Sequence, residues 1–384
     1  MVEDLRGKAC IVGVAESDLG TVGEGVSPLD LQAQAMARAL DDAGLRKSDI
    51  DGLFSASAYY QMASVEVAEY LGIQPRYTDS TTVGGCSFIV HLHHAATALQ
   101  TGACDVALIL YASTQRSGGT GFTTNANSSP YELPYGPRMP ISMYAMSAAR
   151  HMYQYGTTRE QMAEVAVQTR AWAQMNPKAF MRDPLTVDEV INARMISEPF
   201  TLFDCCVVTD GGGAVIVTRP DRAKNLKQQP VYLLGAGEAH WHRHINQMPD
   251  LTVTAGIDSG RRAFEMAGVT PKDIDVCELY DAFTIFPIMH LEDLGFCEKG
   301  EGGSFISGGR IGPGGTCPVN TNGGGMSYCH PGMYGIFTII EAVRQLRSQG
   351  EDRQVDGAQI ALAHGVGGVW SAAATSILGT EATL

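Results

Sequence analysis

The sequence contains an internal repeat, and this repeat restricts the possible folds more than any other feature. Residues 43–51 (AGLRKSDID) are similar in sequence to residues 267–275 (AGVTPKDID). In both copies a helical segment ends near a glycine and the following residues lead into a β-rich run. A second pair, residues 10–16 and 232–238, lies upstream in the same order. The repeat predicts a duplicated α/β fold with two sheets packed through shared helices, and an active site where the halves meet.

The order of apolar runs predicts how each half is built. We expect the first half to alternate β-rich and helical segments, with strands at 8–15, 49–54, 77–80 and 105–111 and helices at 29–45 and 65–71. Between residues 113 and 203, Gly, Ser, Asn, Pro and Met replace the β runs, which indicates an excursion from the sheet with helices at 140–155 and 158–174. A charged linker follows residue 218. We therefore predict an N-terminal half at 1–218 and a C-terminal half at 229–384.

Composition limits the classes of partner. The 384 residues are 45% hydrophobic and 18% charged, which is typical of a compact enzyme with a large core. The formal charge of −14 argues against nucleic acid or an anionic membrane as the main partner. We find no signal-peptide pattern at the N-terminus and no apolar run of about 20 residues. Nine cysteines without a regular framework fit a reducing compartment, so we expect a cytoplasmic protein without a membrane span.

Cys86 is the strongest candidate nucleophile. It follows Gly84 and Gly85 and precedes an apolar, glycine-free run at 89–101 that reads as a helix. A cysteine at a helix N-terminus has a lowered pKa because the unpaired N–H groups favour the thiolate. The alternative is that Cys86 is a small buried residue without a chemical role.

Three segments of the second half carry further chemical groups. They are residues 278–283 (ELYDAF), which follow an expected strand at 274–278; residues 320–332 (NTNGGGMSYCHPG), which precede an expected helix at 333–349; and residues 361–368 (ALAHGVGG). Two histidine clusters, at 91–94 and 240–244, lack acidic or cysteine ligands at zinc-site spacing, so we predict no metal site.

Together these segments resemble the thiolase superfamily over essentially the whole chain, in the branch of sterol-carrier-protein-type thiolases and bacterial lipid-transfer-protein-like relatives. Cys86 followed by serine matches the family nucleophile, and residues 322–324 (NGG) with His330 and Pro331 resemble the segment whose histidine activates it. The resemblance implies an α/β fold of thiolase type, with two mixed sheets in a layered α-β-α-β-α arrangement and an inserted loop domain.

The chain also departs from the thiolase pattern. Cys329 stands where the family has a glycine, and the second catalytic cysteine is missing from both of its usual places, which hold Ala282 and His364. The alternatives for the second acid/base are His364, Tyr280 and Cys329. We rank His364 first because it aligns with the lost cysteine.

The resemblance implies thiolysis of a 3-ketoacyl-CoA with an aromatic, steroid-like or fatty acyl chain. Cys86 would attack the keto carbonyl after His330 takes its proton, and coenzyme A would act as co-substrate rather than as a bound cofactor. Backbone N–H groups at Gly367 and Gly368, together with Asn322, would bind the thioester. One alternative is a retro-aldolase acting on a 3-hydroxyacyl-CoA through tyrosines such as Tyr280, although the retention of Cys86 and His330 favours thiolysis. Another is a non-catalytic acyl-CoA-binding subunit.

The resemblance also implies partners. Thiolases are typically homodimers, and the bacterial relatives often associate with a small zinc-bearing OB-fold protein. We therefore expect a homodimer and, in addition, a partner of this kind.

Overall fold

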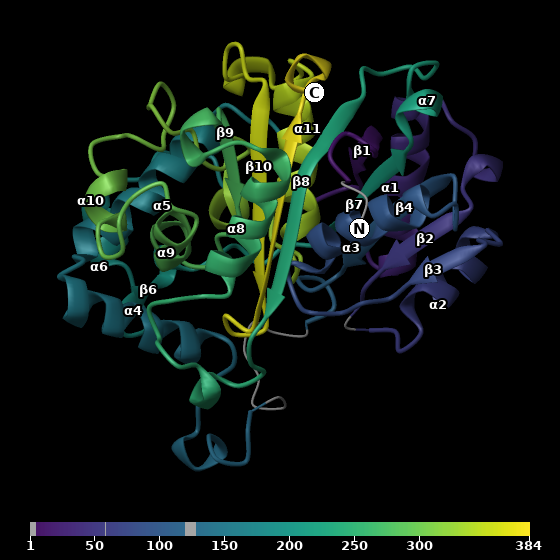
Figure 1. Ribbon diagram of the computed structural model, residues 1–384. Helices are drawn as coiled ribbons and strands as arrows, with labels where there is room; N and C mark the ends of the chain where they lie inside the picture. The colour runs from purple at the N-terminus through teal and green to yellow at the C-terminus, as the bar shows by residue number, and fades with distance from the viewer. Residues whose placement is uncertain (1–4, 58, 120–127) are drawn as a thin grey trace.

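The computed structural model describes residues 5–57, 59–119 and 128–384. Its centre is one nine-stranded mixed sheet in the order β3-β2-β4-β7-β1-β8-β11-β10-β9 (Figure 1). The strands are β1 (Cys10–Glu16), β2 (Gly52–Ser55), β3 (Tyr77–Asp79), β4 (Val106–Ser113), β7 (Gly211–Thr218), β8 (Val231–His240), β9 (Val276–Leu279), β10 (Ile360–Gly367) and β11 (Ala372–Gly379).

The two halves of this sheet meet at a short junction. β2 pairs in parallel with β3 and β4, and β9 pairs in parallel with β10, whereas the other neighbours are antiparallel. Only two residue pairs, Cys10 with Tyr232 and Ile11 with Val231, join β1 to β8. The α/β fold with mixed strands is confirmed. The two expected sheets, however, are continuous at this edge, because β1 and β8 approach closely enough to share hydrogen bonds.

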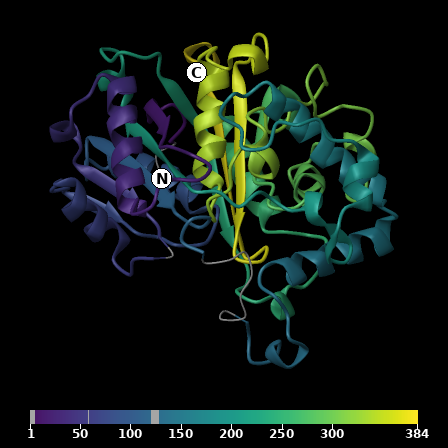
Figure 2. The ribbon, with the colours of Figure 1, turned by 180° about the vertical axis from the view of Figure 1, so that it is seen from behind.

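Helices separate and cover the two halves of the sheet. α1 (Pro28–Ala43) packs on β1, β7 and β4, and α8 (Gly256–Ala267) packs on β8 and β11. Between the halves, α3 (Ser87–Gln100) and α11 (Gly335–Leu346) contact strands of both (Figures 1 and 2). This arrangement gives the layered order of outer helix, strands, central helices, strands and outer helix.

The sequence repeat corresponds to repeated packing. α1 ends at Gly44 with φ of 71°, and α8 ends at Gly268 with φ of 67°. A Cβ atom added to Gly13 would lie 2.4 Å from the carbonyl oxygen of Ala39, and one added to Gly235 would lie 2.1 Å from that of Ala263. In each half a strand glycine therefore allows the outer helix to approach the sheet closely.

The excursion between β4 and β7 packs mainly on the second half. It contains α4 (Ile141–Tyr155), α5 (Arg159–Gln174), α6 (Val187–Asn192) and a hairpin of β5 (Met195–Ser197) and β6 (Phe200–Thr201). α5 contacts α9 (Ile285–Asp293), α10 (Gly302–Ile306) and a π-helical turn at Gly324–Tyr328. The remaining helices are α2 (Ala63–Leu71) and α7 (Pro220–Ala223). Within the described part of the chain, no helix combines the length and the apolar character needed to cross a bilayer.

Candidate active site

Cys86 lies directly before the first turn of α3, as the sequence predicts. Gly84 adopts φ of 85°, and its backbone packs against the turn after β10, so that an added Cβ atom would lie 2.5 Å from the nitrogen of Gly368. The Cys86 side chain is completely buried, and its Sγ donates a long hydrogen bond of 3.8 Å to the carbonyl oxygen of Val83. The thiol therefore lies at the junction of the two halves.

The protonation state of Cys86 differs from the prediction. Burial raises the pKa of its thiol to about 12, and the Glu238 carboxylate adds to this increase, although a backbone N–H group opposes it. The loss of hydration thus outweighs the favourable helix terminus. The expectation of a lowered pKa is wrong for this structure, in which the neutral thiol is the stable form near pH 7.

His330 and Tyr280 form the closest pair of polar side chains at this junction. The Tyr280 hydroxyl lies 3.0 Å from Nε2 of His330, and both residues are buried. The Tyr280 ring covers Gly85, where an added Cβ atom would lie 2.2 Å from a ring carbon. The pair therefore lies beside the residue that precedes Cys86.

Burial keeps both members of this pair neutral. It lowers the pKa of His330 to about 4 and raises the pKa of Tyr280 well above its ordinary value. A neutral phenol can donate its proton to the unprotonated Nε2 of a neutral imidazole. The pair can therefore relay a proton from a substrate group to the imidazole ring.

The loop that carries His330 is held by hydrogen bonds from both halves of the chain. The carboxylate of Asp281, next to Tyr280, accepts from the nitrogen of Gly325 at 2.5 Å, and burial raises the pKa of this carboxyl to about 8. Oγ1 of Thr209 accepts from the backbone nitrogen of His330 at 3.0 Å. These contacts fix the imidazole relative to Tyr280.

Asn322 is part of the same support. Its Oδ1 accepts from the nitrogen of Gly324 at 2.8 Å and from the hydroxyl of Tyr334 at 2.9 Å. The side-chain oxygen of Asn322, which the resemblance implies as a thioester contact, thus already accepts hydrogen bonds from Gly324 and Tyr334.

His364 does not face Cys86. Successive residues of β10 point to opposite faces of the sheet. An added Cβ atom on Gly365 would lie 3.3 Å from Cβ of Cys86, whereas the His364 ring lies against Gly256 of α8, with its Nδ1 2.8 Å from Oγ1 of Thr375. His364 as the second acid/base stays a prediction, but its ring lies on the face of β10 that points away from Cys86. The residue that faces Cys86 is a glycine.

Cys329 is also separated from its neighbour in the sequence. Its backbone is extended, with φ of −160° and ψ of 150°, so its side chain and that of His330 point to opposite sides. Burial raises the pKa of the Cys329 thiol well above its ordinary value. This placement argues against Cys329 as the missing acid/base.

Gly367 and Gly368 form the turn behind Cys86. An added Cβ atom on Gly367 would overlap the carbonyl oxygen of Val83 at 1.6 Å. Tyr144, from α4 of the excursion, donates its hydroxyl to the carbonyl oxygen of Gly368 at 2.6 Å. Sequence reasoning missed Tyr144, since no local motif distinguishes this tyrosine from the others.

Histidines of both clusters make ordinary polar contacts, and in the second cluster Nε2 of His242 lies 3.0 Å from the carbonyl oxygen of Val369. His94 lies 2.6 Å from Asp79 and 3.3 Å from Glu238, and Nε2 of the buried His91 lies 2.9 Å from the carbonyl oxygen of Thr81. Among the residues that the structure describes, no group of three or more His, Cys, Asp or Glu side chains has an arrangement that could hold a metal ion.

Comparison with known proteins identifies the class of this chain. Residues 237–380 match the family model described as thiolase C-terminal domain-like. Acetyl-CoA acetyltransferase of Methanothermobacter thermautotrophicus is 34% identical over 96% of this chain and 98% of its own. The chain therefore belongs to the thiolase superfamily.

Two further relatives are named for a different reaction. A 17-hydroxy-3-oxo-4-pregnene-20-carboxyl-CoA lyase of Mycobacterium tuberculosis is 37% identical over 89% of this chain and 92% of its own. Among solved structures, the Ltp2-ChsH2(DUF35) aldolase superposes with a TM-score of 0.89 at 32% identity, covering 98% of this chain and 99% of that one. The chain thus resembles both acyl-transferring and lyase members of the superfamily.

Proposed function

We propose that this protein cleaves a carbon–carbon bond of an acyl-CoA by a retro-aldol reaction, with Tyr280 and His330 as the acid/base pair. The observation that carries this proposal is the 3.0 Å contact between the Tyr280 hydroxyl and Nε2 of His330. Three features support it further. The Cys86 thiol is protonated, Gly365 occupies the position that faces it, and two close relatives are named as a lyase and an aldolase.

In this reaction the substrate is a 3-hydroxyacyl-CoA. The 3-hydroxyl proton passes to Tyr280 while the Tyr280 proton moves to His330. The oxygen then forms a carbonyl at C3, the C2–C3 bond breaks, and its electron pair remains on the enolate of the shortened acyl-CoA. The proton returns from the pair to C2. The N-terminus of α3 beside the pair carries positive partial charge, which favours the enolate oxygen.

Thiolysis through Cys86 is the second candidate. The observation that favours it is the position of Cys86 before the first turn of α3, together with a relative named acetyl-CoA acetyltransferase. Here His330 would have to leave Tyr280 and accept the thiol proton. The Cys86 sulfur would then attack the keto carbonyl of a 3-ketoacyl-CoA, and the C2–C3 bond would break with its electron pair on the enolate of the shortened acyl-CoA, which takes up the proton from His330. Free coenzyme A would then release the acyl group from the sulfur.

Substrate and co-substrate requirements separate these candidates in the wild-type protein. Matched 3-hydroxyacyl-CoA and 3-ketoacyl-CoA thioesters are incubated with and without free coenzyme A, and the products are measured by mass spectrometry. We expect cleavage of the 3-hydroxyacyl-CoA to an aldehyde or ketone without added coenzyme A. Cleavage restricted to the 3-ketoacyl-CoA with coenzyme A present would replace this proposal by thiolysis. Binding of both thioesters without cleavage would indicate an acyl-CoA-binding subunit.

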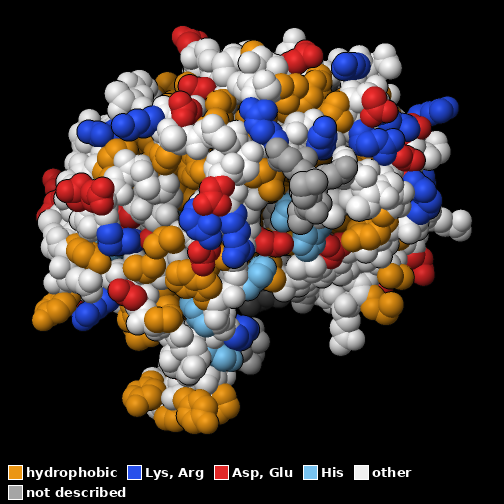
Figure 3. All heavy atoms as spheres, viewed as in Figure 1, with side chains coloured by type: hydrophobic (Ala, Val, Ile, Leu, Met, Phe, Trp, Pro, Cys, Tyr) orange, Lys and Arg blue, Asp and Glu red, His pale blue; other side chains and the backbone are white. Residues whose placement is uncertain are grey.

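We also propose that the chain forms a homodimer and binds a small partner of the DUF35 type, as named for the related aldolase. A projecting segment supports an interaction surface, because Tyr131, Leu133 and Tyr135 are 82%, 49% and 88% exposed. Hydrophobic side chains gather at the tip of this projection, at the bottom of Figure 3. Light scattering of the isolated protein should give twice the chain mass of 41.0 kDa, and a monomer would contradict the dimer.

A further inference from the structure

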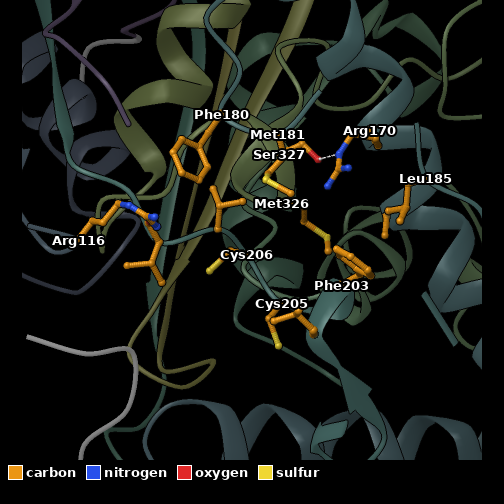
Figure 4. Close-up of a pocket in the computed structure, with 14 residues that line it drawn as sticks. Arg116, Arg170, Phe180, Met181, Leu185, Phe203, Cys205, Cys206, Met326 and Ser327 are labelled. Atoms are coloured by element: carbon orange, nitrogen blue, oxygen red, sulfur yellow. Dashed lines mark hydrogen bonds between the residues drawn. The ribbon is translucent and has the colours of Figure 1, made fainter. Parts of the chain in front are cut away.

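A pocket of about 280 Å³ lies between the excursion and the loop that carries His330 (Figure 4). Its walls include Cys206, whose backbone nitrogen donates to the carbonyl oxygen of Ala282, and Met326, which belongs to the π-helical turn before His330. The same segments thus border the pocket on one side and support the Tyr280–His330 pair on the other. Most of the other lining residues are apolar: Ala166, Phe180, Met181, Leu185, Leu202, Phe203, Val207 and Val208.

A buried arginine lines this largely apolar pocket. Arg170 of α5 is only 4% exposed. Its Nε donates to the Ser327 hydroxyl at 2.8 Å, and its Nη1 donates to the carbonyl oxygen of Asp183 at 2.9 Å. Among the described residues, these two are the hydrogen bonds that the Arg170 guanidinium makes, and no carboxylate lies within ion-pair distance of it.

A buried arginine without a carboxylate partner among the described residues is energetically unusual. A buried charge costs several kcal/mol unless an opposite charge and hydrogen bonds compensate it. Burial lowers the pKa of the Arg170 guanidinium, although the charges of Asp183 and Glu189 partly oppose this. The planar guanidinium has the geometry to bind a carboxylate through two parallel N–H groups.

We propose that this pocket binds a carboxylate carried by the acyl part of the substrate, with Arg170 as its partner. The inference rests on the proposed function, because it names a substrate class for the same acyl-CoA site. The substrate would be a thioester whose acyl chain ends in, or is substituted with, a second carboxyl group.

The size and lining of the pocket favour an acyl carboxylate over a phosphate of coenzyme A. A volume of about 280 Å³ lies just below the usual range for small-molecule sites, so the pocket has room for part of an acyl group but not for a nucleotide. Arg116, the other arginine of the lining, is exposed, and its guanidinium lies 4.9 Å from the centre of the Phe180 ring. Arg116 also donates to Thr21 and Val208, so it does not share the buried environment of Arg170.

Binding of thioesters that cannot be cleaved tests this inference independently of the reaction. Succinyl-, glutaryl- and adipyl-CoA are compared with butyryl-, valeryl- and hexanoyl-CoA by isothermal titration calorimetry. We expect at least one dicarboxylic thioester to bind about tenfold or more tightly than its neutral counterpart, which corresponds to one charge-assisted hydrogen bond. Arg170→Gln should remove this preference without weakening the neutral thioesters, and the control Arg116→Gln should retain it.

Three results would be decisive against the inference. Equal binding of both series by the wild-type protein would overturn it without the need for any variant, while leaving the proposed function intact. Equal weakening of both series and of free coenzyme A in Arg170→Gln would assign the arginine to a phosphate of coenzyme A instead. Failure of every thioester to bind would contradict the proposed function itself.

Discussion

The two halves of this molecule share one arrangement of a strand, an outer helix and a second strand, which we call the frame. They differ in the residues that follow the second strand. In the first half, β1, α1 and β2 lead into the non-polar residue Ala56 and the small residue Ser57, whereas in the second half β8, α8 and β9 lead into Tyr280 and Asp281. The frames themselves pack alike, down to the strand glycine under each outer helix. The two halves therefore have the same frame, and they differ in the side chains of the loops that follow β2 and β9.

The two central helices show the same contrast. Cys86 directly precedes α3, whereas His330 lies five residues before α11. The two helix starts touch, since the nitrogen of Gly335 donates to the carbonyl oxygen of Gly85 at 3.1 Å. The active site thus combines one loop from each half, and neither half contains it alone.

The strongest test of how the halves depend on each other concerns Glu16 of β1 and Arg344 of α11. These residues form a buried ion pair with Nη2 2.6 Å from Oε2, and the Tyr328 hydroxyl donates to the same carboxylate at 2.6 Å. Arg344→Gln should lower the free energy of unfolding by about 3–5 kcal/mol, because it removes the nearer of the two cations that compensate the buried Glu16 carboxylate and leaves only Lys178 at 3.4 Å. Chemical denaturation measures this. The control Arg261→Gln, which breaks an exposed pair with Glu265, should cost less than about 0.5 kcal/mol.

The same pair predicts a pH dependence. Burial alone would raise the pKa of Glu16, but Arg344, Lys178 and Tyr328 together hold it well below its usual range. The stabilisation is therefore present above the unfolded-state pKa of about 4.3 and is lost as the pH falls toward the folded-state pKa. We expect a smaller loss of stability between pH 5 and pH 3 in Arg344→Gln than in the wild type. Identical acid profiles would contradict this assignment.

A methyl group at Gly85 should disturb the contact between the halves at the site itself. The added Cβ atom would lie 2.2 Å from the Tyr280 ring, so the ring must move away from its present position. We expect Gly85→Ala to lower kcat by about a hundredfold, because a shift of about 1 Å in the position of a catalytic group can reduce the rate by this factor. Gly23→Ala is the matched control, because its Cβ atom would meet no other atom within 4 Å. Similar kcat values for the two variants would argue against a role for the position of Tyr280.

A paired substitution tests whether the two frames are equivalent. Gly13→Ala and Gly235→Ala would each force a methyl group against a helix carbonyl, those of Ala39 and Ala263 respectively. We expect each to lower the free energy of unfolding by about 1–3 kcal/mol, the usual cost of overpacking. Thermal or chemical unfolding measures both. A large cost in one half and none in the other would show that the frames differ in rigidity.

The alkylation rates of cysteines provide a smaller test. Cys86 is fully buried with a raised pKa, whereas Cys317 is half-buried and a hydrogen bond with Cys277 lowers its pKa. Iodoacetamide at pH 7.5 should therefore modify Cys317 about tenfold faster than Cys86 in the folded protein. Peptide mapping measures the rates, and denatured protein provides the control. Preferential modification of Cys86 would support an activated nucleophile instead.

Several features of the fold and site can be predicted from the sequence. Apolar periodicity and the repeat predict the strands and helices of both frames, and the Gly84-Gly85-Cys86 segment predicts the helix start that the structure contains. The position of Tyr280 after a strand predicts that it points into the site.

The remaining features depend on tertiary packing, which the sequence does not encode locally. The helix terminus alone predicts a lowered pKa for Cys86, but complete burial reverses the direction. Alignment with a lost cysteine suggested His364, but the two-residue period of β10 places Gly365, not His364, on the face toward Cys86. The environment of the Arg170 guanidinium becomes evident only when the contacts of α5 are known.

The most direct test of the proposed chemistry compares two substitutions on one substrate. Cys86→Ala and Tyr280→Phe are assayed with a 3-hydroxyacyl-CoA in the absence of free coenzyme A. If the Tyr280–His330 pair carries the proton, Cys86→Ala should retain the wild-type rate within about threefold and Tyr280→Phe should lose about a thousandfold. A Cys86→Ala variant without activity beside an active Tyr280→Phe variant would contradict the account and assign the chemistry to the thiol.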